Sequence, residues 1–174
     1  KVIIPFPVIA PDGGTATRKI QFTSEATSLP PSEMRSTNVS YQGREIKLAG
    51  DSKTYPSWSV TLLADTDMVN YNAFVRWKEA ILATEANVRS EQANIFQNYT
   101  ADIELIAYSV TGKPLYNKKI IGAFPVSIGE ISLAWANTDQ VARFNVTFEY
   151  QYWVDQNTDG NDGTPLSGLE NASV

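Results

Sequence analysis

Acidic and amide side chains near the C-terminus have the spacing of a calcium-binding loop. Asp155, Asn157 and Asp159 would supply oxygen ligands at the first, third and fifth positions, and Gly160 occupies the sixth, as the first half of such a loop requires. The twelfth position, which should be a bidentate glutamate, is Leu166, and no helix is predicted on either side. We therefore interpret the segment as a solvated acidic turn and predict no metal site.

Two residue types are missing from the 174-residue chain, which contains no cysteine and no histidine. Disulfides, thiolate metal sites and cysteine nucleophiles are excluded, and the commonest general base and transition-metal ligand is absent. A serine–histidine–aspartate triad cannot be built. Gly13 and Gly14 stand alone rather than in a glycine-rich phosphate loop. We expect neither an enzyme nor a bound cofactor.

Charge and hydropathy exclude further classes of protein. The net charge is −5 and the isoelectric point is about 4.7, whereas a protein that grips nucleic-acid phosphates needs clustered lysine and arginine. No apolar run approaches the roughly 20 residues that a membrane-spanning helix needs, so we expect no membrane span.

The strongest structural pattern is an alternation of apolar and polar residues from 143 to 153 (RFNVTFEYQYW). One face of the predicted strand carries aromatic and apolar residues, namely Phe144, Val146, Phe148, Tyr150 and Tyr152. Such an alternation predicts a strand with one buried face and one wet face. A preceding alternation of Ile131, Leu133 and Trp135 would pair with it through a turn at 137–139, forming a long antiparallel hairpin.

Shorter alternations predict further strands. They are marked by Ile20 and Phe22; Val39 with Tyr41; Ile46 with Leu48; Trp58, Val60 and Leu62; and the ranges 103–110 and 115–121. Turns at Gln42-Gly43 and at 111–113 would join two pairs of them.

One helix interrupts the strands. Thr66 or Asp65 would cap its start, and it meets no proline or glycine before Asn87. Its apolar stripe consists of Met68, Tyr71, Phe74, Val75, Ile81 and Leu82. Lys78 falls within that stripe, where its stem could run along the core edge or its ammonium could pair with a carboxylate of another subunit.

These elements predict a mainly β protein: an antiparallel sandwich or barrel of about seven or eight strands with one packed helix. Residues 1–154 would form the domain. Residues 155–174 are rich in Asn, Asp, Gly and Ser, which is typical of a flexible polar tail.

Two stretches resemble the tail tube proteins of contractile phages of the T-even type. The first, LAGDSKTYPSWSVTLLADTD (48–67), is followed by a helix that contains FVRW (74–77). It is similar to the family's strand, AGD turn, W-x-V-T strand and helix. The second, GAFPVSIGEISLAWANTDQVARFNVTFEYQYW (122–153), is similar to the family's closing hairpin.

The resemblance implies a hexameric ring that stacks into a hollow tube inside a contractile sheath, with a larger barrel closed by strands from every subunit and the helix outside it. The implied partners are further copies of the chain, the tail sheath protein, and the baseplate and tube-terminator proteins. DNA would pass through without specific binding, which the acidic charge suits. The implied location is the virion tail, after assembly in the cytoplasm of the bacterial host.

Two sets of residues are candidates for roles in such a tube. The resemblance implies ring-to-ring contact by the loop and hairpin from Leu29 to Tyr55, with candidate contacts at Tyr41, Gln42, Gly43, Arg44 and Asp51. If the apolar strand faces pack against the helix, polar neighbours would line the bore. Those lumen candidates are Glu45, Lys47, Glu130 and Glu149.

Two other interpretations stay open. Nineteen aromatic residues on a β scaffold would suit a carbohydrate-binding β-sandwich, with calcium at Asp155 as an accessory. Alternatively, the chain could be a tube-initiator or tube-terminator protein of the same tail, since the resemblance covers these too.

Overall fold

The computed structural model describes residues 1–11, 14–86, 88–131 and 141–156. Its strands are β1 (Val2–Ile3), β2 (Ser24–Thr27), β3 (Glu33–Tyr41), β4 (Arg44–Thr54), β5 (Trp58–Leu63), β6 (Leu82–Ala83), β7 (Val88–Arg89), β8 (Ala101–Tyr108), β9 (Pro114–Ile128), β10 (Arg143–Glu149) and β11 (Tyr152–Asp155). The helices are α1 (Thr15–Thr23), α2 (Val69–Ile81) and α3 (Phe96–Tyr99), with a 3₁₀ turn, η1 (Glu91–Asn94). The expectation of a mainly β antiparallel protein is confirmed, although it has more helix than expected.

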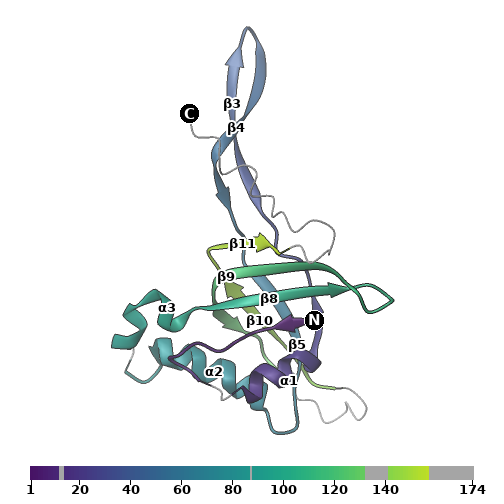
Figure 1. Ribbon diagram of the computed structural model, residues 1–174. Helices are drawn as coiled ribbons and strands as arrows, with labels where there is room; N and C mark the ends of the chain where they lie inside the picture. The colour runs from purple at the N-terminus through teal and green to yellow at the C-terminus, as the bar shows by residue number, and fades with distance from the viewer. Residues whose placement is uncertain (12–13, 87, 132–140, 157–174) are drawn as a thin grey trace.

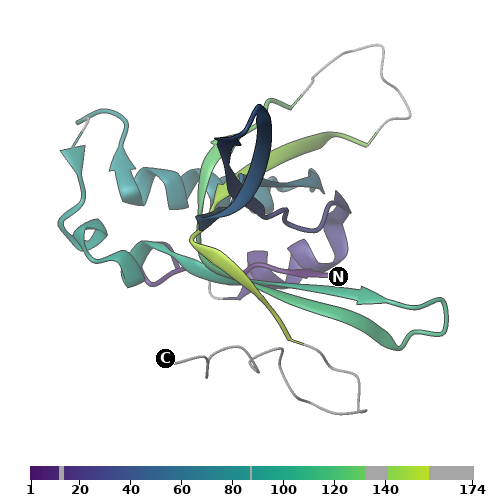
Figure 2. The same ribbon diagram turned by 90° about the horizontal axis from the view of Figure 1, so that it is seen from above.

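A seven-stranded antiparallel sheet forms the body of the molecule (Figure 1), in the order β1-β8-β9-β10-β5-β2 with β11 also on β9. The predicted hairpin β8–β9 and the predicted strand β5 are confirmed. Strands β3 and β4 pair with each other outside this sheet and rise from the body as a separate hairpin, which is seen from above in Figure 2.

The strand predicted at 143–153 is divided in two. Both β10 and β11 pair with β9, but pairing is interrupted at Tyr150 and Gln151. Facing the interruption, Gly122 of β9 has φ +65°, and a Cβ there would lie 2.9 Å from Phe96 Cζ and 3.1 Å from Gln151 Cγ. A residue without a side chain is therefore needed where the sheet bends. The prediction that Tyr152 faces the core is wrong, because it is 46% exposed beyond the bend.

Aromatic rings of α2 and β10 form the centre of the core. Phe74 lies 6.4 Å from Phe144 and 6.0 Å from Phe148 between ring centroids, and Trp77 lies 6.2 Å from Phe148. Phe6, from the N-terminal segment, is 5.3 Å from both Phe74 and Trp77. Helix α2 thus covers the apolar face of β10, and its burial stabilises the fold.

The predicted helix exists, but its start and its buried face differ from the prediction. It begins at Val69, and its N-cap is Met68 in a left-handed conformation (φ 51°) rather than Thr66 or Asp65. Its fully buried positions are Asn70, Phe74 and Trp77, and Leu82 is exposed beyond its end. Lys78 lies on the exposed side, so it does not interrupt the buried row.

The strand predicted from Ile20 and Phe22 is wrong, because these residues belong to helix α1. Ala16 and Ile20 are buried, and the spacing of four places them on one helical face. Phe22 is 87% exposed, since two residues along a helix turn the side chain to the opposite side. A pattern of only two apolar residues was too short to distinguish the period of a strand from that of a helix.

Several predictions fall wholly or partly outside the described residues. The strand expected at Ile131–Trp135 and its turn at 137–139 are among them, apart from Ile131, as are the calcium-loop positions Asn157 and Asp159 and the tail from 157 onward. The expected domain boundary at 154 falls inside β11, which continues to Asp155. Within the described ranges, no acidic cluster has the geometry of a metal site. Among those same ranges, no helix is long and apolar enough to cross a membrane.

Candidate assembly surfaces

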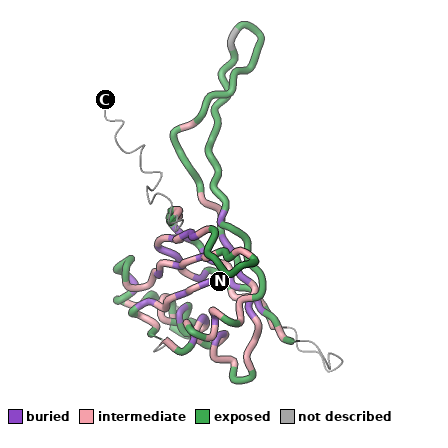
Figure 3. Tube along the Cα trace, turned by 45° about the vertical axis from the view of Figure 1, so that its right-hand side comes forward, coloured by how far each residue is buried: buried purple, intermediate pink, exposed green. Residues whose placement is uncertain are grey.

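The first candidate surface is the projecting hairpin, which we call the arm: β3, β4 and the turn between them. Figure 3 shows the arm exposed along almost its whole length. The turn residues Gln42 and Gly43 have φ 47° and 76°, the left-handed pair that a tight two-residue hairpin turn requires. A two-stranded hairpin is at best marginally stable alone in water, so an arm of this length needs a covering partner.

The arm has one apolar face and one polar face. The cross-strand pairs Val39–Ile46 and Thr37–Leu48 share a face, and Val39, Ile46 and Leu48 are 41, 46 and 50% exposed. The condition set for the lumen candidates, that the apolar strand faces pack against the helix, is therefore not met by Ile46 and Leu48, which are exposed on the arm. An exposed apolar strip is a mark of an interaction surface.

The candidate contacts on the arm lie in two places. Tyr41, Gln42, Gly43 and Arg44 form its tip, whereas Asp51 lies further down β4. The strand pairing shifts register between Met34 and Ser36, and within that shift a Cβ on Gly50 would lie 2.6 Å from the Arg35 carbonyl oxygen. Asp51 thus follows Gly50, where the two strands lie too close together for a side chain. It does not belong to the tip.

Three aromatic donors hold the chain at the base of the arm. The indole N–H of Trp58 donates to the Ser28 carbonyl oxygen (2.7 Å). The Tyr150 hydroxyl (3.2 Å) and the Trp153 indole N–H (3.3 Å) both donate to the Pro31 carbonyl oxygen. We call these three bonds the base clamp. The sequence predicted Trp58 and Tyr150 as core residues; the available signal was that buried Trp and Tyr need a polar partner.

A buried lysine supports the clamp from below. Lys118 is 6% exposed, its Nζ lies 3.1 Å from the centroid of the Trp153 ring, and it pairs with Asp155 at 3.5 Å. Tyr116 also donates its hydroxyl to Asp155. These contacts fix β11, and therefore Trp153, against β9. The mixed polarity of the sequence around Lys118 gave no sign of this cluster.

Tyr150 of the base clamp makes the stability of the fold depend on pH in the alkaline range. Burial, with smaller contributions from Tyr55 and Glu149, raises the pKa of Tyr150 to about 12, against about 10 for an unfolded tyrosine. The unfolded chain therefore ionises first, and stability falls as pH rises through this window. We expect Tyr150→Phe to lose less stability than the wild type between pH 8 and pH 11 in urea unfolding. Equal losses would contradict this role for Tyr150.

The second candidate surface is the polar outer face of the sheet, opposite α2. It is formed by small polar residues of three adjacent strands and one carboxylate: Ser59, Thr61, Ser127, Asn145, Thr147 and Glu149. On the other side of β10, Phe144, Val146 and Phe148 enter the core. Of the four lumen candidates, Glu149 lies on this face and Glu130 is exposed just after β9. Glu45 and Lys47 lie on the polar face of the arm, so the structure does not bring the four together.

An uncovered arm with an exposed apolar face and a wet sheet face are features of a protein that assembles with other subunits. Residues 2–156 match the phage tail tube protein family, and the chain belongs to that family. It is 27% identical over 139 residues to the tail tube protein gp19 of Enterobacteria phage T4, covering 76% of this chain and 79% of gp19.

Two solved structures share the fold. The anti-feeding prophage tube-terminating cap matches with a TM-score of 0.54 and 18% identity, over 76% of this chain and 79% of the other. A chain of the extended sheath–tube complex of an extracellular contractile injection system, PVC, matches with a TM-score of 0.52 and 14% identity, over 89 and 86%. The expected function is confirmed: the chain is a phage tail tube protein, a non-enzymatic structural protein of the virion tail.

Proposed function

We propose that this chain is the repeating subunit of the inner tube, assembling into hexameric rings whose stacking is mediated by the arm. The observation that carries the proposal is the arm itself. Its apolar face is exposed at Val39, Ile46 and Leu48, and a second copy of the chain would cover it. The fold shared with a chain of a sheath–tube complex supports this assignment.

Ring closure would use the edges of the sheet. The sheet order ends at β1 on one side and β2 on the other, so each subunit presents edge strands with unpaired backbone groups. Pairing between neighbours would satisfy these groups and remove edges that otherwise promote aggregation. The tube domain would extend past the expected boundary at 154 to Asp155, where β11 ends, and the residues after it would form a flexible polar tail.

We assign the polar outer face of the sheet to the bore. Helix α2 covers the opposite face of β10, so a ring with the helices outside would turn Ser59, Thr147 and Glu149 inward. Hydrated small residues and negative charge give DNA phosphates no basic anchor, so DNA could slide into the host. The sheath, baseplate and terminator proteins would contact the outer wall and the ends of the tube.

The lumen assignment predicts slower genome release when its charge is reversed. Replacing Glu130 and Glu149 by lysine should still allow tubes to form, but phosphates would then be attracted to the wall, and release should be delayed. High salt should relieve the delay by screening. The matched variant with glutamine at the same positions removes the charge without reversing it and should show a smaller delay. Unchanged release kinetics in the lysine variant would refute the assignment.

Electron microscopy of the purified protein tests the function directly. Tube subunits should form hollow rods of stacked rings, whereas a terminator or initiator, the alternative favoured by the fold shared with a tube-terminating cap, should stop at single rings. A carbohydrate-binding module should remain monomeric and bind glycans. Monomers at all concentrations would contradict the proposal.

A further inference from the structure

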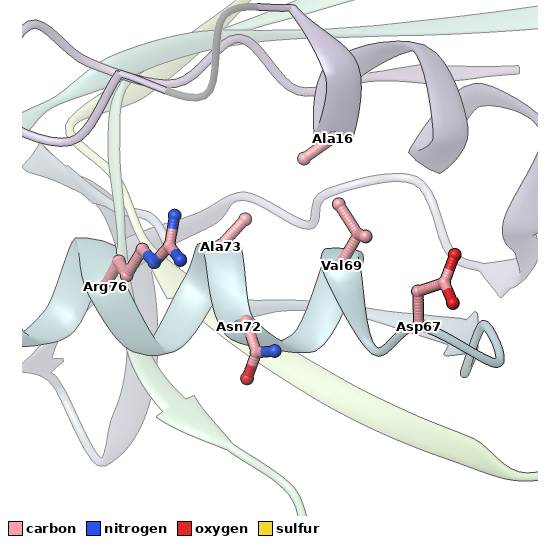
Figure 4. A pocket seen from close by; sticks show the side chains of 6 residues that line it. All are labelled: Ala16, Asp67, Val69, Asn72, Ala73 and Arg76. Atoms are coloured by element: carbon pink, nitrogen blue, oxygen red, sulfur yellow. The ribbon is translucent and has the colours of Figure 1, made fainter.

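A hollow of about 280 Å³ lies between α1 and α2, at the end of the molecule opposite the arm (Figures 1 and 4). Its apolar lining comes from Ala16 of α1 and from Val69 and Ala73 of α2. Asp67 and Arg76 lie toward its two ends, with Asn72 between them (Figure 4). The hollow therefore combines a small apolar centre with one charge of each sign.

The two charges are exposed. Among the described residues, Lys19 forms an ion pair with Asp65, whereas neither Asp67 nor Arg76 forms one; Asp67 adds only a smaller contribution to the raised pKa of Lys19. Both charges are thus accessible to a partner that approaches this end.

The tip of the arm carries the complementary charges. Arg44 and Glu45 are consecutive on β4 and exposed, so their side chains point to opposite faces of the hairpin. Asp67 precedes α2 and Arg76 lies within it, so the two charges are separated along the hollow (Figure 4). An arm tip inserted edge-on would therefore present its two opposite charges toward the two ends of the hollow.

We propose that the hollow between α1 and α2 receives the arm tip of a second copy of the chain in the adjacent ring, with Arg44 on Asp67 and Glu45 on Arg76. Val39 and Ile46, next to the tip, would contact Ala16, Val69 and Ala73. This inference rests on the proposed function, since it specifies the partner of the arm. The interface joins two different surfaces at opposite ends of the folded subunit. Such a head-to-tail contact can add one subunit after another without forming a closed assembly, as a tube requires.

Charge exchange tests the pairing. Arg44→Asp and Asp67→Arg should each place like charges together and raise the protein concentration needed for rod formation by about tenfold or more. The double variant should restore rods near the wild-type concentration. The independent pair Glu45→Arg and Arg76→Glu should behave in the same way. As a mismatched control, Arg44→Asp combined with Glu85→Arg, which alters an exposed carboxylate outside the hollow, should not recover.

All these positions are exposed, and circular dichroism with thermal melting would verify that each variant folds. Rescue in either exchanged pair supports the contact. Normal rods from the single variants, or failure of both double variants to recover while the wild type forms rods, would overturn it and leave the tube function standing. Absence of rods in the wild type would instead overturn the proposed function and, with it, this inference.

Discussion

A variant that lacks Tyr41–Arg44 is expected to fold normally and fail to polymerise. In the intact arm, Ser40 pairs with Glu45 and Val39 with Ile46. After the deletion, Ser40 and Glu45 could form a new two-residue turn closing on the Val39–Ile46 pair, so the arm would be shortened without disturbing the remaining register. The arm tip contributes nothing to the buried core, so stability should change little.

Circular dichroism and sedimentation velocity would measure these two results separately. Gln42→Asn is the matched control, because asparagine accepts the left-handed conformation found at position 42 (φ 47°). That variant should assemble like the wild type. Normal rods from the deletion variant would remove the tip from the interface between subunits.

Phe74→Asp is expected to abolish stable folding. Phe74 is fully buried, and its ring contacts the rings of Phe6, Trp77, Phe144 and Phe148. An unpaired carboxylate there would cost several kcal/mol, a large part of the roughly 5–15 kcal/mol by which a domain is stable. Insoluble protein, or a chain without a cooperative urea transition, is the expected outcome.

Lys78→Asp provides the matched control on the same helix. It introduces the same residue one turn away on the exposed side, where it replaces a favourable charge near the helix C-terminus by an unfavourable one, each worth about 0.3–1 kcal/mol. Both variants introduce an aspartate into the same helix, so a difference in their stability reports whether the replaced side chain is buried. A soluble Phe74→Asp protein with a cooperative transition near that of Lys78→Asp would show that the core is wrongly assigned.

The sequence predicts strands well where one face is buried over several residues. Trp58, Val60 and Leu62 follow this rule, as do Phe144, Val146 and Phe148, because burial of one face imposes a period of two on the sequence. It predicts poorly where a tertiary contact changes the path of the chain. The interruption at Tyr150 depends on Gly122, 28 residues earlier, and nothing local to the alternating segment encodes it.

The candidate surfaces were predictable in position but not in detail. Gln42-Gly43 indicates a hairpin turn from residue types alone. Alternation cannot show whether Ile46 and Leu48 face a core or a partner, since both environments select apolar side chains. The hollow beside Asp67 and the base clamp on Pro31 join residues distant in sequence, so only the three-dimensional structure reveals them.

The base clamp has a mechanical consequence. Strand β3 has nine residues, which extend about 30 Å at about 3.3 Å per residue, so the arm acts as a lever pivoting at Ser28–Pro31. A tilt of about 10° at the pivot would displace the tip by about 5 Å, beyond the reach of a hydrogen bond. The bending rigidity of the proposed tube would therefore be governed by Trp58, Tyr150 and Trp153, aromatic residues that lie about 30 Å from the joint whose alignment they control.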